Sequence, residues 1–308
     1  MSRPSQDTPH SHLVEIGWLA RRLDDASVVA VDCRFELANR DAGRAAYAEG
    51  HIPGALYLDA ERDLSGPAGP HGGRHPLPPL EQFSRTLGAL GIDETITVVA
   101  YDVPQNGFAP RLWWLLRYLG HDRVAVLNGG WPAWLGTGLP VSREREPRRA
   151  PRRFVPHARP ELAADLHEVR RIAAAGGAAL VDSRAPERYR GEVEPLDPVA
   201  GHIPGAVNLP WNATLDQAGR FKPRAELAEQ FNRLGDADPV VYCGSGLTAC
   251  ANVLAMLEAG IRGARLYPGS WSDWCSYPEN AVATGSGDAG RAHERSGRRP
   301  APEEEETG

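Results

Sequence analysis

The side chain best suited to chemistry is Cys243, which begins a compact loop near the C-terminal end of the chain. The apolar run 240–242 stops at this cysteine, and Gly-Ser-Gly at 244–246 leads into a helical pattern, so we expect a strand-to-helix turn. A helix N-terminus offers free backbone N–H groups, and this environment favours the thiolate, the nucleophilic form of cysteine. A buried structural cysteine beside a glycine turn is the alternative, but the complete loop favours a nucleophile.

The residues that follow the cysteine suit the binding of negative charge. Gly244 and Gly246 are expected to take positive φ, which turns successive N–H groups toward the sulfur as an anion-binding nest. Ser245 offers a hydroxyl, and Thr248 is expected to cap the following helix. We therefore predict Cys243 and Ser245 as catalytic residues, and Gly244, Gly246, Leu247 and Thr248 as residues that contact the substrate.

The chain repeats one pattern twice, and this repeat must position the loop. His-Ile-Pro-Gly-Ala occurs at 51–55 and again at 202–206, and Val-Asp-Cys-Arg at 31–34 corresponds to Val-Asp-Ser-Arg at 181–184. Because the landmarks keep the same order in both halves, we predict a duplicated domain. In each half short β-branched runs alternate with helical patterns, which is typical of an α/β fold with a parallel sheet covered by helices.

The two halves differ at the position of the cysteine. Where the second half has Cys243, the first half has Asp102, and the compact glycine loop is missing there. His51 and His202 occur in both halves, so a structural role suits them better than a catalytic one. Since ligands of open α/β sheets bind beyond the carboxyl ends of the strands, we expect the active site in the second domain, with the first domain as a wall.

Length and composition favour two soluble domains joined by a charged, proline-broken linker. We predict these boundaries: a flexible N-terminus at 1–12, an inactive domain at 13–142, a linker at 143–160, a catalytic domain at 161–284 and a disordered acidic tail at 285–308.

Several classes of function are disfavoured. The formal net charge is -6 and nearly all basic residues are arginine, so no broad positive face for nucleic acid is required. No secretory signal pattern is seen and no apolar run approaches the ~20 residues of a membrane span, so we expect a cytoplasmic protein with no membrane partner. Four irregularly spaced cysteines suit a reducing compartment. Without a Cys-x-x-Cys pair, a Walker loop or a Gly-x-Gly-x-x-Gly motif, we predict no metal and no cofactor.

Arginines are concentrated between one predicted strand and the second His-Ile-Pro-Gly-Ala segment, at Arg184, Arg188 and Arg190. Arginine presents a planar fork of donors that suits a carboxylate or a sulfonate, so one of the three is expected to face an anionic substrate. An exposed or interface position is the alternative for any single one.

Together these features resemble the two-domain sulfurtransferases of the rhodanese superfamily, over about residues 13–283. The features are the duplicated Gly-His-Ile-Pro-Gly-Ala segments, the Asp-x-Arg strand ends, the single loop cysteine and the closing Gly-Ser-Trp-Ser-x-Trp. The resemblance implies tandem rhodanese-like domains, each with a parallel sheet flanked by helices, and an inactive N-terminal copy. It also implies that a sulfane sulfur is carried as a persulfide on Cys243.

Within this superfamily the loop is most similar to that of the 3-mercaptopyruvate sulfurtransferases, which read Cys-Gly-Ser-Gly-Val-Thr. In that group the serine that matches Ser245 works with a histidine and an acidic residue, which here match His75 and Glu61, the latter where the family has Asp. Two arginines recognise the carboxylate of the substrate. The first matches Arg188, but the second falls on Asp197, which should weaken the binding of an anionic donor.

We therefore expect a sulfurtransferase that moves sulfur from a small anionic donor to a thiol, such as that of a thioredoxin-like protein, or to cyanide. The loop favours 3-mercaptopyruvate as the donor, and the missing second arginine leaves thiosulfate as the alternative. A cysteine phosphatase is disfavoured because its loop would end in an arginine. A non-enzymatic sulfur-carrier module is a more distant alternative.

Overall fold

The computed structural model describes residues 11–146, 148–175, 179–235 and 237–286. Most of the predicted flexible N-terminus and most of the predicted disordered tail lie outside the described residues. None of the helices in the described part of the chain combines the length and apolar character that a membrane span requires.

The first domain is built on a five-stranded sheet in which every strand pair is parallel. In spatial order the strands are β1 (Leu13–Val14), β5 (Val124–Leu127), β4 (Thr97–Tyr101), β2 (Val28–Asp32) and β3 (Leu56–Tyr57). Its helices are α1 (Ile16–Ala20), α2 (Ala42–Glu49), α3 (Leu80–Ala89), α4 (Ala109–Tyr118) and α5 (Gly130–Gly136).

Helices cover both faces of this sheet, because its strands are apolar on both sides. In β4, Val98 and Ala100 belong to the core under α3 and α4, whereas Val99 and Tyr101 belong to the opposite core under α1 and α5. Side chains alternate between the faces of a strand, so a continuous apolar run serves two cores. The predicted α/β domain with a covered parallel sheet is confirmed.

The second domain repeats this plan with a four-stranded parallel sheet. Its strands, in spatial order, are β7 (Val207–Asn208), β6 (Leu180–Asp182), β8 (Val240–Tyr242) and β9 (Arg265–Leu266). The α-helices are α6 (Leu166–Ala175), α7 (Pro186–Tyr189), α8 (Arg224–Phe231), α9 (Ala249–Ala259) and α10 (Ser270–Trp274), and short 3₁₀ turns lie at Pro160–Leu162, Trp211–Thr214 and Asn232–Leu234.

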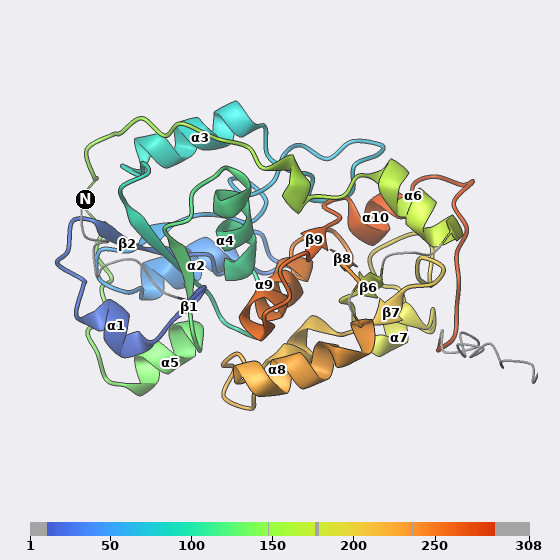
Figure 1. The fold of residues 1–308 in the computed structure, drawn as a ribbon. Coiled ribbons are helices and arrows are strands. Elements are labelled where there is room, and N and C mark those ends of the chain that lie inside the picture. The colour runs from blue at the N-terminus through green and yellow to red at the C-terminus, as the bar shows by residue number, and fades with distance from the viewer. Residues whose placement is uncertain (1–10, 147, 176–178, 236, 287–308) are drawn as a thin grey trace, which may run out of the picture.

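The two domains share a continuous core where α4 and α9 lie side by side (Figure 1). Trp113 and Leu116 of α4 belong to the same buried cluster as Val253 and Leu254 of α9. The side chains of α9 are buried all round its first two turns, as expected for a helix enclosed by protein on every side. The N-terminus of α9, which carries the Cys243 loop, is therefore held by both domains.

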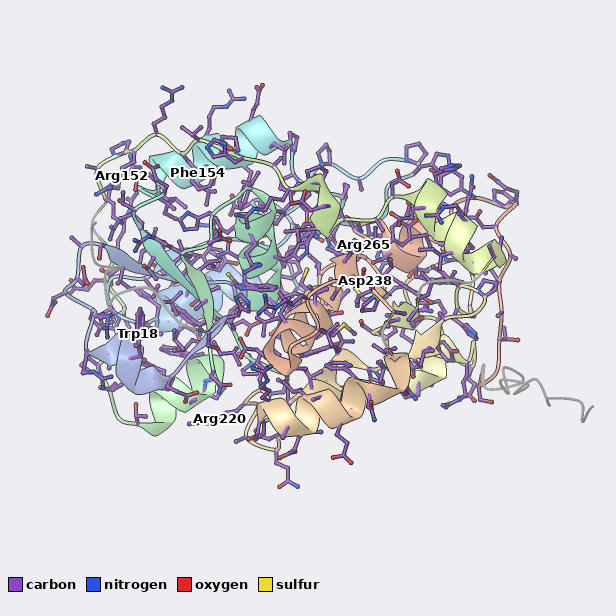
Figure 2. All side chains as sticks on the ribbon, in the orientation of Figure 1. Trp18, Arg152, Phe154, Arg220, Asp238 and Arg265 are labelled. Atoms are coloured by element: carbon purple, nitrogen blue, oxygen red, sulfur yellow. The ribbon has the colours of Figure 1, made fainter. Side chains whose placement is uncertain are left out.

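The connecting segment crosses the surface of the first domain, where Figure 2 labels Arg152 and Phe154. The Arg152 amide donates to the Gly88 carbonyl at 2.8 Å, its guanidinium pairs with Asp93, and Phe154 is buried. The contacts of Arg152 and the burial of Phe154 therefore fasten the segment to the first domain.

Candidate active site

The Cys243 loop connects the end of β8 to the start of α9, as predicted. Cys243 is 2% exposed, and its sulfur accepts the Gly246 N–H at 3.2 Å. Gly246 has φ +80°, and a Cβ there would overlap the Pro268 carbonyl oxygen, so only glycine fits. The loop therefore aims a backbone dipole at the sulfur, which stabilises negative charge there.

Two details of the expected loop are wrong. Gly244 is not among the glycines with positive φ; instead, a Cβ at this position would crowd the guanidinium groups of Arg74 and Arg188. Thr248 makes no side-chain cap, because its backbone is already helical (φ -74°, ψ -19°) and a cap residue takes an extended backbone.

Helix α10 holds the loop in place from the other side. The Cys243 N–H donates to the Ser270 hydroxyl at 3.1 Å, and the Trp271 N–H donates to the Cys243 carbonyl at 3.0 Å. Ser270 has φ 55°, the one positive value among the described non-glycine residues. Such strain is held where the surroundings determine the conformation, and here it aims a hydroxyl at the reactive residue. No pattern in the sequence identified Ser270 as part of the site.

A first-domain segment docks on α10 and delivers His75 to the site. The Gly72 N–H donates to Asp273 Oδ1 at 2.7 Å, and the Arg74 N–H donates to Ser272 Oγ at 3.0 Å. His75 is consequently buried, with its Nδ1 2.7 Å from the Ser245 hydroxyl oxygen. The structure thus brings together Ser245 and His75, which the sequence separates by 170 positions.

His75 is neutral at physiological pH. Burial, reinforced by the positive charges of Arg111, Arg74 and Arg40, lowers its pKa to about 3. Glu61 Oε1 lies 3.6 Å from Nε2, beyond hydrogen-bond range, and the other oxygen of Glu61 pairs with Arg40 at 2.8 Å. The carboxylate near Nε2 favours the tautomer with its proton there, which leaves Nδ1 to accept the Ser245 hydroxyl proton.

A pocket of about 240 Å³ opens onto the cysteine at the domain boundary. Of the predicted substrate contacts, Arg188, Gly244, Leu247 and Thr248 line this pocket and Gly246 does not. Leu37, Arg74, Phe108 and Trp211 also line it and were not predicted from the sequence. The lining residues are Leu37, Arg74, Phe108, Arg184, Ala185, Arg188, Leu196, Trp211, Cys243, Gly244, Ser245, Leu247 and Thr248. Three of them are arginines and none is acidic, so the pocket suits a small anion.

Arg111 of α4 ties the loop to the first domain. Its side chain is fully buried, and its guanidinium donates to the carbonyls of Gly246 at 3.1 Å, His75 at 3.2 Å and Leu64 at 3.3 Å. Burial lowers the pKa of this guanidinium. Arg111 was not among the residues predicted from the sequence, although it is an arginine inside the apolar run of α4.

The first domain lacks the catalytic loop, as predicted. The Asp102 carboxylate accepts the N–H groups of Phe108 and Ala109 at the start of α4, and burial raises its pKa to about 7. His51 and His202 stack on Tyr47 and on Tyr189, and each ring donates its Nδ1–H to the backbone carbonyl of its stacking partner at 2.7 Å. Both histidines are structural, as expected.

Within the described ranges no group of three or more His, Cys, Asp or Glu side chains is placed to hold a metal ion. All four cysteines are free thiols, and Cys243 is the one that lines this pocket.

Comparisons with known proteins agree with this geometry. The family model of the rhodanese-like domain matches residues 15–137 and 165–277. A Pseudomonas aeruginosa relative, "Probable 3-mercaptopyruvate sulfurtransferase", is 43% identical over 273 residues, covering 87% of this chain and 96% of the relative. SseB of Mycobacterium tuberculosis, named as a thiosulfate sulfurtransferase, is 36% identical over 286 residues, covering 88% of this chain and 95% of the relative.

A solved structure gives the same result for the fold. The crystal structure of SseA from Escherichia coli, described among the 3-mercaptopyruvate sulfotransferases, has a TM-score of 0.75 and 32% identity. The match covers 85% of this chain and 99% of SseA. The resemblance inferred from the loop and the repeats is confirmed: the chain belongs to the rhodanese-like family, with the tandem organisation of its two-domain sulfurtransferases.

Proposed function

We propose that this sulfurtransferase takes a sulfane sulfur from 3-mercaptopyruvate, holds it as a persulfide on Cys243 and passes it to a thiol or to cyanide. The observation that supports this most directly is the pocket, in which the reactive sulfur lies beside Ser245 and the charged lining consists of arginines alone. A pocket of this size and charge suits a small anionic donor.

In the first half-reaction the Cys243 thiolate attacks the donor sulfur and forms an S–S bond. The C–S bond of the donor breaks, and its electron pair passes to the carbon, which gives the enolate of pyruvate. That carbon takes up a proton, which balances the proton lost in forming the thiolate. The products are pyruvate and Cys243 with one added sulfur. In the second half-reaction an acceptor thiolate or cyanide attacks the outer sulfur and regenerates Cys243.

Ser245 and His75 suit the stabilisation of the enolate. The negative charge of the enolate lies mainly on the former carbonyl oxygen, and a hydroxyl beside the cysteine can donate to it. The lone pair of His75 Nδ1, 2.7 Å from Ser245 Oγ, holds this hydroxyl beside the cysteine, and the hydroxyl can turn its proton from Nδ1 to the enolate oxygen as that charge forms. Glu61 would act only through the orientation of His75, because it lies 3.6 Å away.

Thiosulfate is the second candidate donor. The relative SseB carries that activity in its name, and three arginines in the pocket also suit a dianion. We favour 3-mercaptopyruvate because the residues after the cysteine are Gly244 and Ser245, which bring no positive charge but supply a hydroxyl for an enolate.

The acceptor and the setting complete the proposal. We propose a thiol acceptor, such as a thioredoxin-like protein, and a cytoplasmic location, which four free cysteines suit. We also propose domain boundaries at 13–142 and 161–284, which enclose both matches to the rhodanese-like domain.

The test compares kcat/KM for 3-mercaptopyruvate and for thiosulfate, with cyanide as acceptor, in the wild type and in Cys243→Ser. We expect 3-mercaptopyruvate to be preferred by the wild type, and the serine variant to fold but to lose turnover. Mass analysis should find about 32 Da added to Cys243 after incubation with donor, one sulfur atom. Turnover by Cys243→Ser would refute the mechanism, and a preference for thiosulfate would reassign the donor. A stable persulfide without turnover would favour a sulfur-carrier role.

A further inference from the structure

Two arginines from different domains meet above Gly244, the residue that follows the reactive cysteine. A Cβ placed on Gly244 would lie 3.1 Å from Nη2 of Arg74 and 3.4 Å from Nη1 of Arg188. Arg74 comes from the first-domain segment that docks on α10, whereas Arg188 comes from α7 of the second domain. Both line the pocket. The backbone beside Cys243 is therefore flanked by two guanidinium groups.

Acidic side chains hold both guanidinium groups from behind. Asp197, which is 9% exposed, accepts from Nη1 of Arg74 and, at 3.3 Å, from Nη2 of Arg188. Glu194 accepts from Nη2 of Arg188 at 2.6 Å and from Nε at 3.2 Å. Neither acid lines the pocket. The acids thus fix the orientation of the arginines and leave the face toward the pocket positive.

The nitrogens nearest Gly244 are the ones left without a partner. Among the described residues, neither Nη2 of Arg74 nor Nη1 of Arg188 donates a hydrogen bond within the protein. The third arginine of the pocket differs, because Nε, Nη1 and Nη2 of Arg184 all donate to Asp182, Glu194 or the Gly201 carbonyl. Two oriented donors, one from each domain, therefore remain for a ligand.

The backbone of Arg74 is held in place by helix α10. Its backbone N–H is bonded to Ser272 of α10, the helix that also holds the Cys243 backbone. Burial lowers the pKa of Arg74, and the positive charge of Arg188 lowers it further. Two cations in one partly buried pocket repel each other, and an anion bound between them removes that cost.

We infer that Arg74 and Arg188 together bind the carboxylate of the sulfur donor, with one oxygen on each guanidinium, so that the specificity site is formed across the domain boundary. The inference rests on the proposed function for the identity of the donor. It gives Asp197 a role opposite to the expected one. This acid stands where a second arginine was expected, and it anchors a replacement arginine supplied by the other domain.

The test uses two donors that differ in one group. 1-Mercapto-2-propanone keeps the ketone and the thiol of 3-mercaptopyruvate but has no carboxylate. We expect Arg74→Gln to lower kcat/KM for 3-mercaptopyruvate by roughly 10- to 100-fold, mostly through KM, because a charge-assisted hydrogen bond is lost. Turnover of the donor without the carboxylate should change by less than about threefold. Equal losses for both donors, or no loss for either, would overturn the inference.

The matched control is Arg190→Gln. Arg190 lies two positions after Arg188, and its guanidinium pairs with the exposed Glu192, away from the pocket lining. We expect wild-type kinetics with both donors. A loss equal to that of Arg74→Gln would show that any nearby positive charge serves, and the assignment to Arg74 would fail.

Binding of pyruvate, measured by calorimetry, separates this inference from the proposed function. Pyruvate carries the carboxylate but no sulfur to transfer, so its affinity tests the two arginines whether or not 3-mercaptopyruvate is the donor. We expect at least about tenfold weaker binding to Arg74→Gln, and a smaller loss in Arg74→Lys, which keeps the charge and the contact with Asp197 but not the fork. Wild-type affinity in both variants would refute the inference. A wild type that binds pyruvate but does not turn over 3-mercaptopyruvate would refute the proposed function alone.

Discussion

The histidine beside Ser245 shows how burial sets the chemistry of a single residue. An imidazole usually titrates near neutral pH, but His75 is buried among three arginines and its pKa falls to about 3. It therefore keeps a nitrogen lone pair for the Ser245 hydroxyl proton throughout the physiological range. A protonated ring could not accept that proton, and it would add a fourth positive charge to this region.

The neutral state of His75 predicts a pH-dependent contribution to stability. Above about pH 6.5 the ring is neutral in both the folded and the unfolded chain, so its full contribution is present. As the pH falls toward 3, the unfolded chain binds a proton that the folded chain does not. The free energy of unfolding should then drop by about 1.4 kcal/mol per pH unit from this group. His75→Gln removes this term.

The measurement is urea unfolding of the wild type and of His75→Gln at several values between pH 7 and pH 5. As the pH falls from 7 to 5, the unfolding free energy of the wild type should decrease by about 2 kcal/mol relative to that of His75→Gln. Comparing the two proteins is necessary because Asp102 has the opposite effect. Its pKa is raised from 3.8 to about 7, so its contribution is lost as the pH rises through that range. A constant difference would contradict a neutral, buried His75.

At the scale of the element, the loop between β8 and α9 depends on the backbone of Gly246. This residue needs a left-handed backbone and also needs the space that a Cβ would occupy, because the Pro268 carbonyl lies there. Its N–H is the one bonded to the Cys243 sulfur. Any shift of this residue therefore moves a donor away from the reactive atom.

Gly246→Ala should lose activity and stability together. We expect unfolding free energy to fall by about 2 kcal/mol or more, from strain at positive φ and from the clash, and kcat to fall at least tenfold. Gly205→Ala is a matched control, because Gly205 has φ +78° and nothing lies within 4 Å of its Cβ position. Its variant should show only the strain cost, about 1 kcal/mol, with wild-type kcat. Similar kinetic losses in both variants would contradict a specific role for the loop.

The order and type of the helices and strands could be predicted from the sequence. The side-chain contacts between segments far apart in the sequence were harder to predict. The covered parallel sheets follow from continuous apolar runs, and the Cys243 turn follows from an apolar run that ends before glycines. His75 was identified only through family resemblance. The partners of Arg74 and Arg111 lie 123 and 135 positions away in the sequence, and no local pattern records such contacts. For Arg111 the sequence offers only its place in an apolar helical run, which marks a buried cation but not its partners.

At the scale of the whole molecule, the first domain, which has Asp102 in place of the cysteine, forms part of the proposed active site. It supplies His75 and Arg74 through one docked segment, and Leu37 and Phe108 as apolar wall. Arg111 joins this half to the catalytic loop through backbone carbonyls on both sides of the boundary. The first domain therefore keeps the duplicated fold without the cysteine, and it serves as a fixed second wall of the pocket.

Arg111→Met should weaken the coupling between the domains. Methionine fills part of the space but leaves the carbonyls of Gly246, Leu64 and His75 without this donor. Leaving buried carbonyls without a charged donor should lower the free energy of unfolding by about 3 kcal/mol or more, so we expect a clearly lower urea midpoint. The Gly246 end of the loop also loses its anchor, and kcat should fall at least tenfold while the fold persists in circular dichroism.

Arg117→Met is the matched control, because Arg117 lies on the same helix but faces His12 and the ring of Trp113. It should change stability by less than about 1 kcal/mol and leave kcat unchanged. If Arg111→Met retains wild-type kcat, the first domain does not position the loop through this residue. If both variants lose stability equally, the loss belongs to helix α4 as a whole. A large loss of stability and kcat in Arg111→Met, with neither loss in Arg117→Met, would show that Arg111 couples the two domains.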